Sequence, residues 1–349
     1  MTVRSIALAR AAAVAMAVTI AASGAANAQS RDQIRIVGSS TVYPFAAAVA
    51  ENLARTTGFR APIVESTGTG GGMRLFCGGV GPQHPDVTNA SRPITKSEIE
   101  NCRNNGVTEI VEVPVGYDGI VITLKRGSQK VDLTREQIWK ALARNVPVNG
   151  RLVPNPYKTW NEVDPKLPNW PIEVMGPPPT SGTRDAFNEL VMETGCHNVP
   201  EIKAISDSRQ RVSACTQVRE DGRYIEAGEN DNLIIQRLAT GQAGLMGVHG
   251  YSFLEENLDK IEVANVEGVE PTFEDISSGK YPVARTIFFY AKKAHIGIIP
   301  GMREYMTEFV SDRAMGESGY LEQRGLIPLP PEKLGEVRET VRSLKTIAQ

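Results

Sequence analysis

The feature of this sequence that most constrains its fold is a repeated alternation between short, β-rich apolar runs and patterns typical of helices. The first three pairs are a run at 34–37 before a helix from Pro44 to about Thr57, a run at 63–64 before a glycine-rich turn and a helix, and a run at 87–90 before a helix from Thr95. Such alternation is typical of α/β proteins with mainly parallel sheets. The chain has 349 residues, 41% of them hydrophobic, and can bury a full core.

Helix boundary signals support this interpretation. Pro44 suits a first helical turn, and Gly58 suits a helix end. Thr95 and Thr134 each stand three residues before a Glu or Gln, which is the spacing of a capping box. We therefore expect a helix to begin directly after each of these threonines.

The stretch 110–124 predicts a connection between two lobes. Its apolar residues form two extended segments, which we expect to be joined by a bend at Gly116-Tyr117-Asp118-Gly119. Lobe 1 is then expected over 29–117 and 285–349, and lobe 2 over 118–284, with two crossings that can act as hinges. The further elements behind this division are a helix from about Thr183, a helix at 230–240, a strand at 244–248, a returning strand at 285–290 and surface helices at 300–310 and 331–347.

The N-terminus has the three parts of a secretory signal peptide. Arg4 and Arg10 precede a small-apolar run at 11–22, and Ala26-Asn27-Ala28 supplies a cleavage site, so residues 1–28 are predicted to be removed. The alternative is a membrane anchor, but the run is short for a membrane span and no Cys follows the cleavage site to carry a lipid. We expect export to the periplasm and no membrane insertion of the mature chain.

Four cysteines, an even number, favour disulfides in an exported protein. Three connectivities are possible, and pairing of sequence neighbours is the natural choice: Cys77 with Cys102, and Cys196 with Cys215. A metal site is disfavoured because no two cysteines are closely spaced and the four histidines are scattered. We expect neither a metal nor any other cofactor.

The charge balance excludes one class of partner. The chain has 38 Lys and Arg against 40 Asp and Glu, and only 22% of its residues are charged. A nucleic-acid-binding protein would normally carry an excess of basic residues, so nucleic acid is not expected as a partner.

Three small, polar segments stand where a strand should end and a helix should begin. They are Gly38-Ser39-Ser40-Thr41-Val42, Ser66-Thr67-Gly68-Thr69-Gly70-Gly71-Gly72 and Thr180-Ser181-Gly182-Thr183-Arg184-Asp185. A helix N-terminus presents unpaired N–H groups, neighbouring hydroxyls add donors, and Arg184 adds a forked cation, so together they suit an oxyanion. For each segment alone, the alternative is an ordinary N-cap or turn. The occurrence of three such segments favours the anion site.

Two further residues are candidates for the same site. Arg92 follows the strand predicted at 87–90 and is expected to supply a second cation or, alternatively, to pair with a surface acid. Asp118, in the presumed crossing, is expected to accept a proton from a protonated phosphate or to orient Arg92 or Arg184; its alternative is an ordinary turn residue.

Catalytic signatures are absent from the sequence. The P-loop, dinucleotide-binding, zinc-protease and serine-hydrolase motifs are not found. Ser40 would need a general base to act as a nucleophile, and no His is close to it in the sequence. An enzyme is therefore the weaker hypothesis.

The order of the motifs resembles that of the periplasmic phosphate-binding proteins of phosphate-specific ABC transporters, across essentially the whole mature chain. The motifs are the 38–42 segment with Pro44, the 67–72 run, Asn89-Ala90-Ser91-Arg92-Pro93-Ile94, Asp118-Gly119-Ile120, Ser181-Gly182-Thr183-Arg184 and Gly241-Gln242-Ala243-Gly244-Leu245-Met246-Gly247. The resemblance implies a two-lobe type II (Venus flytrap) fold with two mainly parallel sheets, flanked by helices. It also implies anion contacts from Ser40, Thr41, Val42 (main-chain N–H), Thr69, Gly70, Ser181, Gly182, Thr183 and Arg184.

Two departures from the family bear on selectivity. The best-known members carry an Asp where this chain has Arg92, and that acceptor lets them take hydrogen phosphate and refuse sulfate. They also place their Arg ahead of the Ser-Gly-Thr, where this chain has Pro177. Selectivity over sulfate then depends on whether Asp118 supplies the acceptor.

The residues and the resemblance together predict a non-catalytic capture protein. It is expected to bind inorganic phosphate in an interlobe cleft as a monomer and to deliver it to an inner-membrane ABC permease. The alternatives are a binding protein for sulfate or phosphonate, a secreted phosphoester hydrolase using Ser40 or Thr41, and a surface protein that adheres or scavenges phosphate without a permease.

Overall fold

The computed structural model describes residues 31–347 except 180, 228–230 and 256. The predicted signal peptide, residues 1–28, lies outside the described residues, as does Thr180 of the third polar segment. Among the described residues, none of the helices combines the length and the apolar character that a membrane crossing requires.

The strands form one nine-stranded mixed sheet and two small two-stranded sheets. The order in the large sheet is β2-β1-β3-β13-β4-β10-β8-β9, and β11 also pairs with β4. Its strands are β1 (Arg35–Gly38), β2 (Ile63–Ser66), β3 (Val87–Ala90), β4 (Ile110–Lys125), β8 (Val174–Gly176), β9 (Tyr224–Glu226), β10 (Met246–Gly250), β11 (Ile261–Val263) and β13 (Ala284–Lys292). The small sheets pair β5 (Asp132–Leu133) with β12 (Asn265–Val266), and β6 (Asn145–Val148) with β7 (Arg151–Pro154).

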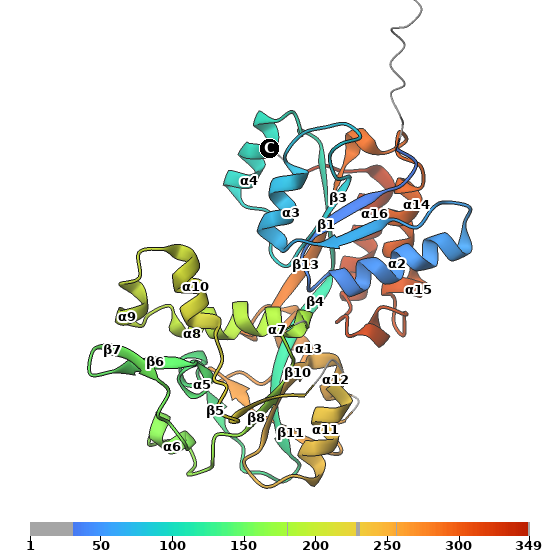
Figure 1. Ribbon diagram of the computed structural model, residues 1–349. Coiled ribbons are helices and arrows are strands. Elements are labelled where there is room, and N and C mark those ends of the chain that lie inside the picture. Colours follow the sequence, from blue (N-terminus) through green and yellow to red (C-terminus); the bar gives the residue numbers. More distant parts are fainter. Residues whose placement is uncertain (1–30, 180, 228–230, 256, 348–349) are drawn as a thin grey trace, which may run out of the picture. The chain divides into compact units, whose positions relative to one another are not determined.

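Strand β4 joins two groups of strands into one mixed sheet, where the sequence analysis expected two mainly parallel sheets. Residues from Ile110 to Gly119 pair antiparallel with β13, and the rest of β4 pairs antiparallel with β10 and β11 (Figure 1). The two predicted segments form one continuous strand, because residues 116–119 continue the pairing with β13; a register shift leaves Val115 as an extra residue just before the predicted bend. The parallel pairs predicted by the alternation lie on either side of these antiparallel strands.

Helices follow most strands. They are α2 (Tyr43–Thr56), α3 (Thr69–Phe76), α4 (Lys96–Asn104), α5 (Arg135–Leu142), α6 (Trp160–Val163), α7 (Gly182–Phe187), a π-helical turn (Asn188–Glu193), α8 (Thr194–Cys196), α9 (Pro200–Lys203), α10 (Ser208–Thr216), α11 (Asp231–Thr240), α12 (Tyr251–Glu255), α13 (Phe273–Ser277), α14 (Met302–Phe309), α15 (Asp312–Met315) and α16 (Pro331–Ser343), with 3₁₀ turns at Lys293–His295 and Glu322–Arg324.

Both predicted capping boxes are confirmed. The Thr95 hydroxyl accepts a hydrogen bond from the Glu98 amide at 3.3 Å, and the Thr134 hydroxyl accepts one from the Gln137 amide at 3.1 Å. These bonds satisfy amides that the first helical turn leaves unpaired, and so fix where α4 and α5 begin.

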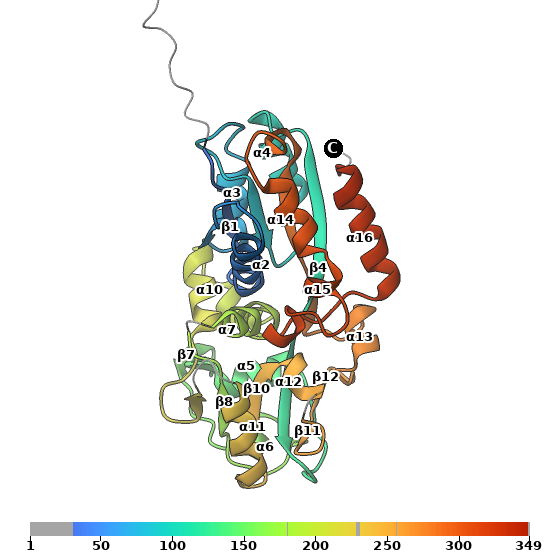
Figure 2. The same ribbon diagram turned by 90° about the vertical axis from the view of Figure 1, so that its right-hand side faces the viewer.

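The core beside β13 is built from aromatic side chains. Helix α14 packs against α2 and α16, and α16 packs against β4 (Figure 2). The Phe309 ring lies 5.2 Å from the Phe289 ring and 5.9 Å from the Tyr305 ring, measured between centroids, and all three residues are fully buried. These contacts fix β13 in the middle of the sheet.

The predicted disulfide pairing is confirmed. Cys77 bonds Cys102, and Cys196 bonds Cys215, so all four cysteines are paired. The first bond links the end of α3 to α4, and the second links α8 to α10. Each closes a short loop, which restricts the unfolded chain more than the folded one.

Helix α3 touches strand β1 at two glycines. A Cβ placed on Gly72 would lie 2.4 Å from the Cα of Gly38 and 2.7 Å from the Thr88 hydroxyl. Gly38 itself has a φ of +123° and a Cβ on it would lie 2.2 Å from the Asn89 carbonyl oxygen. Only glycine fits at either position, and this close approach holds the start of α3 against the end of β1.

We predict that Gly72→Ala lowers the free energy of unfolding by about 1–3 kcal/mol, because its methyl group has no space. Gly70→Ala is the matched control in the same glycine run, since nothing lies within 4 Å of its Cβ position. That change should leave the stability unchanged or raise it by up to about 1 kcal/mol through helix propensity. Urea unfolding of both variants measures the difference; equal stability of the two would contradict the close packing.

Candidate functional site

Two of the three predicted polar segments, and the motif that begins at Asn89, follow strands that end at one edge of the sheet. Strand β1 lies parallel between β2 and β3, and Gly38 is in register with both Ser66 and Asn89, so the carboxyl ends of the three strands meet. The Thr67 amide donates to the Gly38 carbonyl at 2.9 Å, and the Ser39 amide donates to the Asn89 carbonyl at 3.0 Å. The chain segments that follow these strands are therefore neighbours.

The first segment, the 39–42 loop, presents unpaired amides. Ser39 accepts from the Tyr43 amide and so begins α2, but within the described residues the amides of Ser40, Thr41 and Val42 have no hydrogen-bond acceptor. The side chains of Ser39, Thr41 and Val42 are buried. Successive free N–H groups at the start of a 14-residue helix form a concave donor set that suits an anion.

The second segment places Thr69 against Ser91. The Thr69 hydroxyl accepts from the Ser91 amide at 3.1 Å, and the two hydroxyls lie 3.0 Å apart. The amides of Thr69 and Gly70 have no acceptor among the described residues. Ser91 belongs to one of the sequence motifs but was not predicted as a site residue; the signal that could have found it is its place directly after a buried strand that neighbours β1.

The third segment meets the first. A Cβ on Gly182 would lie 3.2 Å from the Ser40 carbonyl oxygen and 3.3 Å from the Thr41 Cα, and the Ser40 hydroxyl donates to the Asp185 carboxylate. The Ser181 hydroxyl accepts from the Thr183 amide at 3.2 Å, so Ser181 is the N-cap of α7, as the alternative interpretation of this segment had it. The start of α7 therefore lies beside the 39–42 loop.

An arginine that the sequence analysis missed faces the same loop. Arg285 Nη2 donates to the Thr41 hydroxyl at 3.3 Å, Arg285 Nη1 pairs with Glu189, and Arg285 Nε lies 3.5 Å from Asp118 Oδ2. Arg285 and Asp118 are directly opposite each other on the antiparallel strands β13 and β4. Because these positions are 167 residues apart, only the strand register, and no local motif, reveals the pair.

Burial of Asp118 changes its acidity. Burial raises the pKa of the Asp118 carboxyl, the Arg285 charge opposes that rise, and the negative charge of Glu189 adds to it. Asp118 Oδ2 and Arg285 Nε have no hydrogen-bond partner among the described residues, so the two groups interact as an ion pair at 3.5 Å. The sequence analysis expected Asp118 to orient Arg92 or Arg184, but the arginine that lies beside it is Arg285.

The Arg184 side chain, in the first turns of α7, contacts Pro177 after β8 and Tyr224 at the start of β9. This side chain is buried and donates to the Pro177 carbonyl at 2.9 Å and to the Tyr224 hydroxyl at 3.2 Å, and its guanidinium lies 4.8 Å from the centre of the Tyr224 ring. Burial raises the pKa of Tyr224 to about 12, so the phenol stays neutral. These contacts fasten α7 to β8 and β9.

Arg92 pairs with Glu98, the acid of the capping box at the start of α4. Its guanidinium makes two hydrogen bonds to the Glu98 carboxylate, at 2.9 and 2.8 Å, and 41% of its side chain is exposed. This matches the alternative in which Arg92 pairs with a surface acid. The hydrogen bond to Glu98 is also the main reason that the pKa of Arg92 is raised.

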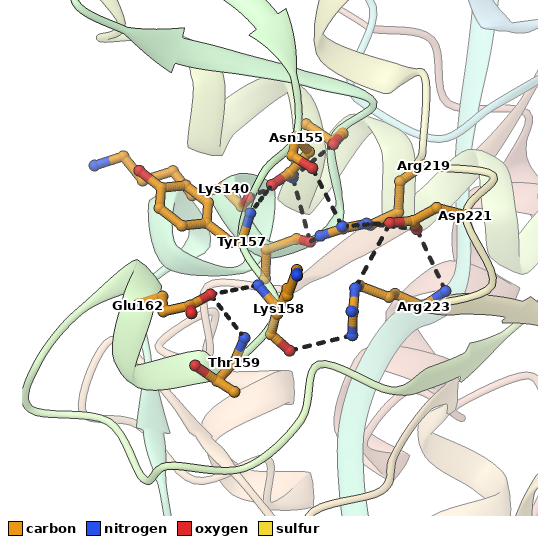
Figure 3. Close-up of polar contacts among 11 residues, drawn as sticks. Lys140, Asn155, Tyr157, Lys158, Thr159, Glu162, Arg219, Asp221 and Arg223 are labelled. Atoms are coloured by element: carbon orange, nitrogen blue, oxygen red, sulfur yellow. Dashed lines mark hydrogen bonds and ion pairs between the residues drawn. The ribbon is translucent and has the colours of Figure 1, made fainter.

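A second polar cluster, around the buried Arg219, is internally satisfied (Figure 3). Arg219 pairs with Asp221 at 2.6 Å and donates to the Ala141 carbonyl at 2.9 Å, and the pKa of Asp221 is lowered chiefly by its hydrogen bond with Arg219. Asn155 binds the Lys140 carbonyl at 2.8 Å. The cluster connects the end of α5 to the segments before α6 and β9. Its donors form hydrogen bonds within the protein.

A comparison with known protein families assigns this chain to a class. A family model described as a PBP superfamily domain matches residues 23–313, and the chain belongs to this superfamily.

The relatives are similar over most of their length. The protein SphX of Synechococcus elongatus is 30% identical, over 88% of this chain and 81% of its own, and the phosphate-binding protein PstS of Staphylococcus saprophyticus is 28% identical, over 90% and 87%. The crystal structure of a possible phosphate binding protein from Planctomyces limnophilus is 27% identical, with a TM-score of 0.72 over 89% of this chain and 98% of that one. The family resemblance indicated by the motifs is confirmed.

We predict that Arg285→Met lowers the free energy of unfolding by roughly 3 kcal/mol at pH 8, because it leaves Asp118 buried and charged without its cation. The pKa of Asp118 is already raised by burial and should rise further without Arg285. Since an acid with a raised pKa in the folded state costs stability only once it is ionised, the loss should shrink as the pH falls below that pKa.

Urea unfolding at pH 8 and at pH 4.5 tests this prediction. Arg342→Met is the control, because the Arg342 side chain is 79% exposed and its ion pair, among the described residues, is with the neighbouring Glu339 on α16. It should show no measurable change at either pH. A loss for Arg285→Met that is equal at both pH values would contradict the ion pair with Asp118.

Proposed function

We propose that this protein captures inorganic phosphate at the site formed by the 39–42 loop, Thr69 and the start of α7. The observation that carries the proposal is the Arg285 guanidinium bonded to Thr41 at the edge of a loop with three unpaired amides. The PstS relative is named for phosphate binding, and the Planctomyces structure is described as a possible phosphate binding protein. The protein acts by binding and not by catalysis.

The chemistry of phosphate fits these donors. Phosphate carries one to two negative charges at neutral pH, and removing its water without replacement would be very costly. Amides of Ser40, Thr41, Val42, Thr69 and Gly70 can replace that water without first breaking another hydrogen bond. Each charge-assisted hydrogen bond contributes about 1.5–3 kcal/mol, which makes tight binding attainable after the cost of ordering the site.

The remaining predicted residues have distinct proposed roles. Gly182 and Thr183 bring the start of α7 to the ligand, and Ser181 and Arg184 hold that helix start in place through the cap and the Tyr224 contact. We propose that Arg285 is the arginine that contacts phosphate. Arg92 lies outside this donor set, paired with Glu98.

Asp118 is proposed to set selectivity. A buried carboxylate whose pKa is raised can accept a proton from hydrogen phosphate, whereas sulfate at neutral pH has none to offer. The Arg285 side chain lies between Asp118 and Thr41, so the acid acts on the ligand directly or through this arginine.

Capture and delivery require motion and a partner. We propose two lobes, 29–117 with 285–349 and 118–284, in a type II Venus flytrap arrangement that closes by hinge motion where β4 and β13 cross. The signal-peptide pattern and the two disulfides support export to the periplasm. The proposed partner is an inner-membrane ABC permease, which the closed monomer would meet.

We predict that isothermal titration calorimetry of the wild-type protein shows phosphate binding at one site per chain. Arg285→Lys should lower the affinity about tenfold or more, because the ammonium cannot reach both Thr41 and the anion in a forked geometry. Arg184→Lys should change it less, because its contacts are with Pro177 and Tyr224.

A titration with sulfate in the same buffer measures selectivity. Absence of any heat with phosphate would reject the proposed ligand. A larger loss for Arg184→Lys than for Arg285→Lys would instead keep the ligand and reassign the cation.

A further inference from the structure

Glu189 stands at the candidate site although neither the sequence motifs nor the ligand chemistry requires it. It lies in the π-helical turn that continues α7, four residues after Asp185 and on the same side of the helix. Its carboxylate pairs with Arg285 Nη1, while Asp185 accepts the hydroxyl of Ser40. Two carboxylates of one helix therefore bind two donors of the proposed phosphate site.

The two acids that contact Arg285 differ in how firmly they are held. Asp118 is fixed by the strand register opposite Arg285, and only 16% of its side chain is exposed. Glu189 has 50% of its side chain exposed and reaches the guanidinium by a flexible side chain from the helix. The arginine, with 12% exposed, thus has one acidic neighbour fixed by the strands and one that can move into water.

We propose that the Glu189 carboxylate occupies the place of the ligand anion on Arg285 and is displaced when phosphate binds. The inference rests on the proposed function and adds an affinity-determining residue to that site. Glu189 is then an internal competitor: a positioning residue that keeps the guanidinium aimed at the 39–42 loop in the empty protein and weakens phosphate binding.

The charges around Arg285 support displacement. With Asp118 ionised, Arg285 is already neutralised, so a doubly charged phosphate beside an unmoved Glu189 would place an uncompensated excess of negative charge in a partly buried site. Moving the half-exposed Glu189 into water removes its own negative charge from that excess, at the cost of a single ion pair. Partly exposed ion pairs are weak, so the competition lowers affinity without preventing binding.

The alternative role for Glu189 is to stabilise the phosphate-bound state. In that case the Glu189–Arg285 pair would persist in the bound state and hold the helix against the loop, and its loss would weaken phosphate binding. The two roles predict changes of opposite sign, which makes them separable by one variant.

The experiment is calorimetric titration of phosphate into the wild-type protein, Glu189→Gln and Glu336→Gln. Glu336 lies exposed on α16 and has no ion pair within the described residues, so its variant controls for the change in net charge. We expect Glu189→Gln to lower the phosphate Kd about three- to tenfold and Glu336→Gln to leave it unchanged. An unchanged or higher Kd for Glu189→Gln would overturn the proposal.

Thermal unfolding with and without saturating phosphate gives a second readout. Glu189→Gln should gain more stability from phosphate than the wild-type protein does, because tighter binding stabilises the folded state more.

Glu189→Asp keeps the charge, so its Kd should stay closer to that of the wild-type protein than to that of Glu189→Gln. A Kd equal to that of Glu189→Gln would contradict a role based on charge. If the wild-type protein gave no phosphate heat, the proposed function itself would fail, and that outcome is distinct from all of these.

Discussion

The antiparallel pairing of β4 with β13 is the constraint on which the rest of the structure depends. These strands connect the parallel pairs on one side of the sheet to those on the other, and the aromatic core of Phe289, Tyr305 and Phe309 holds β13 in place. The same register sets Arg285 opposite Asp118. A buried ion pair seldom adds net stability compared with apolar residues, so its value here lies in aiming a guanidinium at the loop after β1.

The local features of the fold could be predicted from the sequence. Capping boxes at Thr95 and Thr134, the pairing of neighbouring cysteines and the start of a helix near Thr183 all depend on interactions within about 25 residues along the chain, and each is found in the structure. The continuity of β4 was missed because glycines typical of a bend also fit an extended strand, and only the partner strand decides between the two.

The residues of the candidate site also differ in whether local sequence pattern could predict them. Thr41, Thr69 and Gly182 follow strand ends or precede helices, so local pattern was enough to propose them. Arg285 lies within a strand and belongs to none of the sequence motifs. Arg184 was predicted as the cation of the anion site because it directly follows the Ser-Gly-Thr. In the structure Arg184 points to Tyr224. Side-chain direction at a helix start depends on tertiary packing, which sequence spacing does not contain.

The contact between Gly38 and Gly72 has a mechanical consequence. With no side chain between them, the end of β1 and the first turns of α3 behave as a single rigid piece, and the amides after each are fixed relative to one another. In the proposed hinge motion, the two donor sets would therefore move together as parts of one lobe. If the proposed closure occurs, the reorganisation would then be confined to the other lobe and to the side chains that lie between the two.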